Sequence, residues 1–129
     1  MDILKDLKKN ILNYNEIEFA IVFGSILDKN RFNKNSDIDI AIAGNNIFDY
    51  DFILDLNLSL SASFNYEFDI VDLNKNSGVI LQQALCNGKI LLNKNNELYV
   101  QLIKKMWYNQ ADMMQNVRMI WKKRREKLL

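Results

Sequence analysis

Histidine and proline are absent from this chain of 129 residues, which also has only one cysteine and four glycines. Without histidine, the usual general base and the commonest zinc ligand are missing. Any catalysis must therefore rest on carboxylates, hydroxyls, lysine or a hard metal ion. The single cysteine, Cys86, cannot form an internal disulfide, and its apolar neighbours in LQQALCNG predict a buried position on a helix.

Long apolar runs are also absent, because no stretch reaches the length of about 18 residues that a membrane-spanning helix needs. The start, MDILKDLKKN, lacks the apolar stretch and the small-residue cleavage site of a signal peptide. We therefore expect a cytoplasmic protein with no membrane partner.

An excess of one charge is missing as well, since 17 basic and 16 acidic side chains give a net charge of +1. This balance argues against a domain that binds nucleic acid through broad electrostatics, and a small ligand or a protein partner fits better. The basic ending WKKRREK either complements the dipole of a helix C-terminus or docks an acidic partner or RNA. The sequence leaves a homo-oligomer open.

The pattern that is present mixes helices and strands. Helical spacing indicates helices at 3–12 and 48–64, and SGVILQQALCNGK is typical of a serine-capped helix that ends at Gly88. Strands are indicated by FAIVF, DIDIAIA, YEFDIVDL and KILL. We expect one α+β domain over residues 1–129, with a small mixed sheet packed with helices, a core at about 15–93 and a helical tail at about 96–129.

Two aspartates in the second strand form the first candidate site. Alternate residues of a strand share a face, so Asp37 and Asp39 project together, opposite Ile38 and Ile40. Two anions this close repel unless a cation lies between them, and such oxygen ligands suit Mg²⁺. For a third acid we favour Asp69 over Asp72, because a mid-strand carboxylate between apolar residues is costly without a partner, whereas Asp72 can cap the following turn.

Gly24 and Ser25 directly follow the first strand. Such a pair lets the backbone approach a phosphate closely, with amide donors and a hydroxyl at hand. Ser36, just before Asp37, either hydrogen-bonds within the site or caps the loop, whereas for Arg31 and Lys34 we favour solvated positions.

Taken together, Gly24-Ser25, eleven intervening residues, Asp37-Ile38-Asp39 and the later Phe68-Asp69-Ile70 resemble the minimal nucleotidyltransferase domain of the DNA polymerase β superfamily. The short length and the SDID spelling are most similar to stand-alone MNT proteins, many of which are antitoxins encoded beside HEPN-domain toxins. The resemblance covers about residues 15–93 and implies the polymerase β-like fold.

The resemblance also implies an activity and its site. One or two Mg²⁺ ions would be held by Asp37, Asp39 and Asp69, while Gly24 and Ser25, with Ser36 as a further candidate, would bind the nucleotide. The substrate would be ATP, and AMP would pass to a tyrosine hydroxyl of a partner HEPN toxin. Asp69 would help to lower the pKa of that hydroxyl or accept its proton.

Two other functions stay compatible with the sequence. One is nucleotidyl transfer to a small molecule such as an aminoglycoside, although such enzymes usually carry a further helical domain. The other is a non-catalytic antitoxin that neutralises its partner by binding alone.

Overall fold

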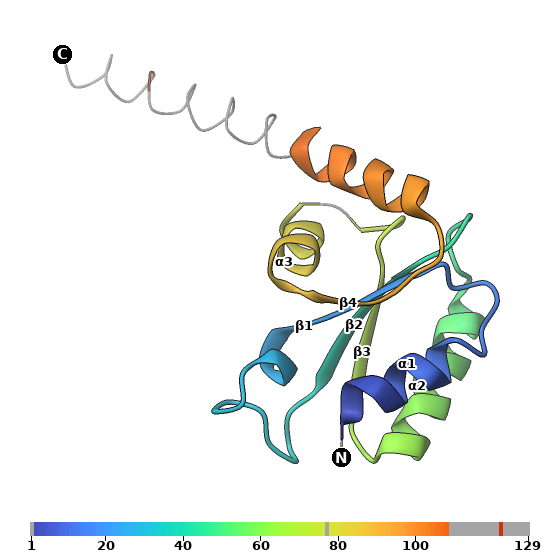
Figure 1. The fold of residues 1–129 in the computed structure, drawn as a ribbon, viewed down its shortest axis with the longest axis vertical. Coiled ribbons are helices and arrows are strands. Elements are labelled where there is room, and N and C mark those ends of the chain that lie inside the picture. Colours follow the sequence, from blue (N-terminus) through green and yellow to red (C-terminus); the bar gives the residue numbers. More distant parts are fainter. Residues whose placement is uncertain (1, 77, 109–121, 123–129) are drawn as a thin grey trace.

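A computed structural model describes residues 2–76, 78–108 and 122 of the chain (Figure 1). Its elements are helices α1 (Ile3–Ile11), α2 (Tyr50–Phe64) and α3 (Val79–Asn87), the 3₁₀ turn η1 (Gly24–Leu27), and strands β1 (Phe19–Phe23), β2 (Ile38–Ala43), β3 (Phe68–Asp72) and β4 (Lys89–Asn93). Residues 96–108 form a further helix. The expected α+β class is confirmed; of the predicted tail, 109–121 and 123–129 lie outside the described residues.

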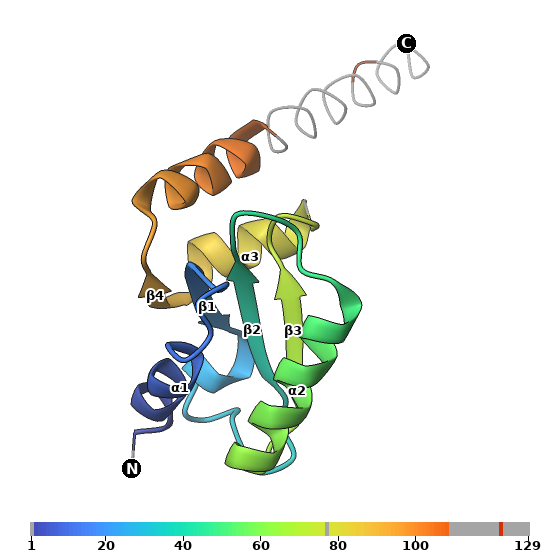
Figure 2. The same cartoon turned by 90° about the vertical axis from the view of Figure 1, so that its right-hand side faces the viewer.

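The four strands form one mixed sheet in the order β3-β2-β1-β4. Strand β1 pairs antiparallel with β2 and with β4, and the latter pairing has an irregularity between Ala20 and Ile21. Strands β2 and β3 are parallel, and helix α2 makes the crossover between them (Figure 2). The parallel pairing matters for function, because it brings the beginnings of β2 and β3 to the same end of the sheet.

Helices cover both faces of the sheet, with α1 and α2 on one side and α3 on the other (Figure 1). Alternation along β2 separates two cores: Ile38, Ile40 and Ile42 pack on the α1 and α2 side. Ala41 and Ala43 pack on the opposite side, in a cluster that includes Leu81 of α3 and Leu102 of helix 96–108. We call this second side the α3 face.

Capping residues explain where α2 begins and ends. The Asp49 carboxylate accepts a hydrogen bond from the Phe52 amide at 2.8 Å, and Asn65 ends the helix in the left-handed conformation with φ 57°. Phe48, predicted to be the first residue of the helical stripe, lies before the cap. Its ring stacks on Phe52 with a centroid distance of 4.7 Å, so it still packs against the helix.

Helix α3 corrects one expectation. Cys86 lies on the helix as predicted, but it is exposed rather than buried. The helix buries a narrow stripe containing Leu81 and Ala84. Cys86, two residues beyond Ala84, lies outside that stripe, with its Sγ atom 3.6 Å from Sδ of Met106. Ser77, the predicted cap, lies outside the described residues, whereas the predicted end at Gly88 is confirmed.

Across the described parts of the chain, no helix combines the length and the apolar character that crossing a membrane would require.

Candidate active site

The acidic residues singled out in the sequence meet where β2 and β3 begin. Asp39 is paired in register with Asp69 of β3 and with Phe23 of β1. Directly paired residues project from the same face of a sheet, so the two carboxylates stand side by side on the α3 face. Asp37 lies one residue before β2 and two before Asp39, which puts it at the edge of the same group.

The pKa of Asp39 reflects this crowding. Partial burial raises the pKa of the Asp39 carboxyl above its ordinary value, and the negative charges of Asp69 and Asp37 raise it further. All three effects disfavour a negative charge on Asp39. A cation or a phosphate-bound metal at this position would relieve the repulsion.

Gly24 allows the Asp39 carboxylate to lie where it does. The glycine has a φ of +81°, in the left-handed region that other residues rarely adopt. A Cβ atom built on Gly24 would collide with Oδ2 of Asp39. The Asp39 carboxylate can therefore lie against the turn after β1 only because residue 24 has no side chain.

Ser25 is the second residue of η1, and its side chain is half-buried. Its carbonyl accepts a hydrogen bond from the Asp28 amide at 2.9 Å, which closes the turn. Since β1 and β3 flank β2 on opposite sides, the Gly24-Ser25 turn and Asp69 lie on opposite sides of Asp39. The phosphate-binding role of the turn stays a prediction.

A pocket of about 300 Å³ opens beside this turn, and we call it the glycine pocket. Its lining comes from the end of β1, the η1 turn and loop, β2 and α3: Phe23, Gly24, Leu27, Arg31, Asp39, Gln83 and Asn87. Arg31, for which we favoured a solvated position, is exposed and lines the pocket. Sequence reasoning missed Gln83 and Asn87, whose signal is two amide side chains four residues apart on one helix.

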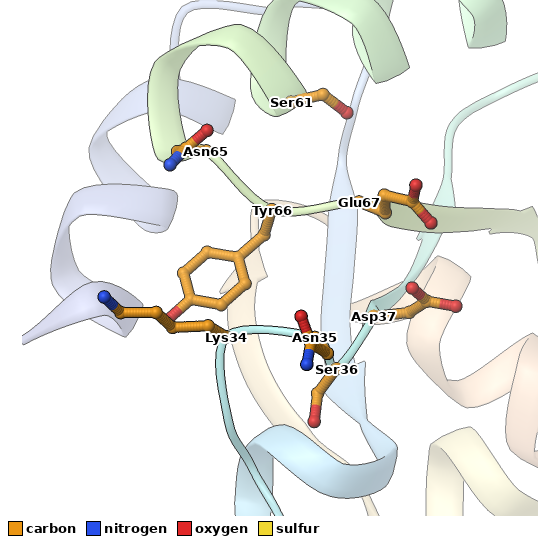
Figure 3. Close-up of a pocket in the computed structure, with 8 residues that line it drawn as sticks. All are labelled: Lys34, Asn35, Ser36, Asp37, Ser61, Asn65, Tyr66 and Glu67. Carbon is orange, nitrogen blue, oxygen red and sulfur yellow. The ribbon is translucent and has the colours of Figure 1, made fainter.

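A second pocket, of about 340 Å³, lies on the other side of Asp37, and we call it the Tyr66 pocket (Figure 3). It is formed by the loop before β2 together with the end of α2 and the turn into β3: Lys34, Asn35, Ser36, Asp37, Ser61, Asn65, Tyr66 and Glu67. The Ser36 hydroxyl accepts a bond from the Asn33 amide at 3.1 Å and lies 3.4 Å from the Arg31 carbonyl. These bonds match the loop-capping alternative, and nucleotide binding by Ser36 stays a prediction.

The choice between Asp69 and Asp72 rested on a wrong premise about burial. Asp69 is exposed, whereas Asp72 is only 5% exposed. The Asp72 carboxylate accepts hydrogen bonds from the Phe48 amide at 2.8 Å and the Asn74 amide at 2.9 Å, so it caps the turn after β3 as expected. Asp69 is the acid placed beside Asp39.

The fit of these residues to Mg²⁺ depends on how many carboxylates the ion uses. Among the residues that the structure describes, no three histidine, cysteine, aspartate or glutamate side chains lie close enough to hold a metal ion. Mg²⁺, however, binds through one or two carboxylates and completes its shell with water and substrate phosphates. The crowded Asp39 with Asp37 is compatible with that donor set, and a three-carboxylate site stays a prediction.

Comparison with known proteins gives one family and several solved structures. The family described as "Polymerase beta, Nucleotidyltransferase" matches residues 5–97. A structure of the MntA-HepT toxin-antitoxin is 25% identical, covers 94% of this chain and 99% of its own, and has a TM-score of 0.68. A tri-AMPylated Shewanella oneidensis HEPN toxin in complex with MNT antitoxin matches with 25% identity, 91% and 98% coverage, and a TM-score of 0.65.

A third structure, a toxin-antitoxin with AMP-PNP, is 24% identical, with a TM-score of 0.75 and coverage of 95% of this chain and 98% of that one, and it supports the fold. Among curated proteins, none shows a significant sequence match. The expected polymerase β-like fold is thus confirmed, and both the Gly24-Ser25 turn and the three acids lie inside the matched family region. Because that region spans well over half of its length, this chain belongs to the polymerase beta nucleotidyltransferase family.

Proposed function

We propose that this protein is an antitoxin that transfers AMP from ATP to a tyrosine hydroxyl of a partner HEPN-type toxin. The observation that carries the proposal is the in-register Asp39 and Asp69 pair, with Gly24 in contact with the Asp39 carboxylate. Support for the acceptor comes from the likeness to a complex in which an MNT antitoxin is bound to an AMPylated HEPN toxin.

In the proposed reaction, the phosphates of ATP lie in the glycine pocket beside Gly24 and Ser25. The phenol oxygen of the tyrosine attacks the α-phosphorus, and the bond from that phosphorus to the oxygen bridging to the β-phosphate breaks. Pyrophosphate leaves with the electron pair, and the phenol proton passes to the Asp69 carboxylate and on to water. The product carries AMP on the tyrosine through a phosphodiester.

The acidic side chains would hold the metal and orient the reactants. When bound to Asp37 and Asp39, with Asp69 alongside, Mg²⁺ would neutralise the charge of the phosphates. Asp69, on the side of Asp39 away from the glycine pocket, would face the incoming hydroxyl. The exposure of Asp69 suits this role, because a large acceptor must reach it from solvent.

The test mixes the protein with α-labelled ATP, Mg²⁺ and the protein encoded by the adjacent gene, and follows transfer of the label. Mass spectrometry then looks for AMP on a tyrosine of the partner. Asp39→Asn should lower the transfer rate about a hundredfold or more, because it removes a charge at the reacting phosphate. The matched control is Asp55→Asn, an exposed residue of α2 on the other side of the sheet, which should transfer at the wild-type rate.

Unchanged transfer by Asp39→Asn would contradict the assignment of the active site. If the wild-type protein neutralises the partner without adding AMP, the non-catalytic alternative holds instead.

A further inference from the structure

The two pockets at the site lie on either side of the Asp37 and Asp39 pair. Asp39 borders the glycine pocket, and Asp37 borders the Tyr66 pocket. The two acids lie within three residues of the chain, Asp37 just before β2 and Asp39 inside it. The two pockets therefore border neighbouring acids of the same site.

Displacement at phosphorus requires the attacking and leaving oxygens to stand on opposite sides of the reacting atom. If the triphosphate lies in the glycine pocket, with Gly24 and Ser25, its pyrophosphate end occupies that side of Asp39. The attacking hydroxyl must then arrive from the side of Asp37 and Asp69. The Tyr66 pocket is lined by Asp37 and by Glu67, which lies two residues before Asp69. With about 340 Å³ it is large enough for a few residues of a peptide.

The lining of the Tyr66 pocket suits a peptide rather than a phosphate group. Asn35 and Asn65 carry side-chain amides, which donate and accept hydrogen bonds as a peptide backbone requires. The Tyr66 ring is held by stacking on Phe32 with a centroid distance of 5.2 Å, which gives the pocket a rigid wall. Among the described lining residues, the carboxylates of Asp37 and Glu67 outnumber the one cation, Lys34, and would repel a phosphate group.

Glu67 adds a charge preference. Its side chain is exposed, and in Figure 3 its carboxylate points to the same side as that of Asp37. The Glu67 carbonyl accepts a hydrogen bond from the Ile38 amide at 2.9 Å, which holds this residue at the start of the β2 and β3 pairing. Because Asp37 is assigned to the metal, Glu67 is left to attract a basic group on the acceptor.

We propose that the Tyr66 pocket is the acceptor subsite, which binds the peptide segment around the hydroxyl that receives AMP, with a basic side chain of that segment against Glu67. This inference rests on the proposed function and adds the location of the acceptor and its charge.

The first experiment blocks the pocket. Asn35→Trp places a large ring on an exposed loop residue that lines it, and the matched control Asn45→Trp places the same ring on an exposed residue beyond the other end of β2. For Asn35→Trp, the KM for the partner protein should rise about tenfold while the KM for ATP stays at the wild-type value. Asn45→Trp should change neither KM.

The second experiment reverses the charge. Glu67→Lys should raise the KM for the partner about tenfold at low salt, and less at high salt, because a repulsion replaces an attraction. The control Glu16→Lys changes an exposed glutamate before β1, at the opposite end of the sheet, and should have no such effect.

The outcomes separate this inference from the function on which it rests. Absence of AMP transfer by the wild-type protein contradicts the proposed function itself. Wild-type transfer combined with an unchanged partner KM in both Asn35→Trp and Glu67→Lys overturns the acceptor subsite. A rise in the KM for ATP in both variants, with no change for the partner, would assign the Tyr66 pocket to the nucleotide and would overturn it as well.

Discussion

At the scale of single residues, the site depends on a contact between a glycine and a carboxylate. Gly24 combines a positive φ with a position where any side chain would meet Asp39. Gly78 also has a positive φ, of +72°, but a Cβ there would have no atom within 4 Å. A substitution of Gly78 therefore tests the backbone conformation alone, whereas a substitution of Gly24 tests the backbone conformation together with the collision with Asp39.

Gly24→Ala and Gly78→Ala should each lower the free energy of unfolding by about 1 kcal/mol, because alanine rarely adopts a positive φ. Only Gly24→Ala should also weaken ATP binding, since its methyl group displaces the Asp39 carboxylate. Urea unfolding and calorimetric titration with ATP in the presence of Mg²⁺ measure the two effects. Wild-type ATP affinity in Gly24→Ala would show that the contact with Asp39 has no role in binding.

At the scale of elements, strand β3 carries two acids with different roles, Asp69 at the proposed active site and Asp72 in the stability of the fold. Asp69 projects from the α3 face and is exposed, whereas Asp72 belongs to the opposite face and is buried. The Asp72 carboxylate joins β3 to the segment before α2 through the Phe48 amide, and to the following turn through the Asn74 amide. The same residue type therefore has different roles on the two faces.

Asp72→Ala should lower the free energy of unfolding by about 1–3 kcal/mol, because it leaves two amides without their acceptor. Asp69→Ala should stay within about 0.5 kcal/mol of the wild type, as surface changes usually do, but should lose AMP transfer. Denaturant titration and the transfer assay on both variants check this contrast. The reverse pattern, with stability lost at Asp69, would contradict the assignment of the faces.

At the scale of the whole molecule, helix 96–108 is attached to the core by one lysine as well as by apolar packing. Lys105 Nζ donates hydrogen bonds to the carbonyls of Leu73, Asn74 and Asn76, at 3.3, 3.3 and 3.1 Å. These carbonyls belong to the segment between β3 and α3. The helix thereby connects to the loop that orients α3, which carries Gln83 and Asn87 of the glycine pocket.

Lys105→Met keeps most of the apolar stem and removes the ammonium, so three carbonyls lose a charged donor. We expect the free energy of unfolding to fall by about 1–3 kcal/mol. Lys104→Met changes the exposed neighbour and serves as the control, with an effect of about 0.5 kcal/mol or less. Equal stability of the two variants would show that the carbonyl contacts of Lys105 contribute nothing.

Local patterns were enough to predict most elements. The FAIVF run is strand β1, and the helix expected at 48–64 is α2, which begins at Tyr50. Two predictions about burial were wrong. Cys86 is exposed rather than buried, and the buried acid of β3 is Asp72, whereas we expected Asp69. Burial depends on which helix packs against which face, and that information is not contained in the spacing of neighbouring residues.

The sequence by itself determined the composition of the site, because strand alternation puts Asp37 and Asp39 on one side and a glycine after a strand permits close approach. Only the tertiary structure decided what surrounds them. The register that places Asp69 beside Asp39, thirty residues away, arises from pairing between distant strands. The packing of α3 then brings Gln83 and Asn87 to the same pocket. Such contacts join segments far apart in the chain, so they follow from the folded packing of the whole sheet and its helices and not from local periodicity.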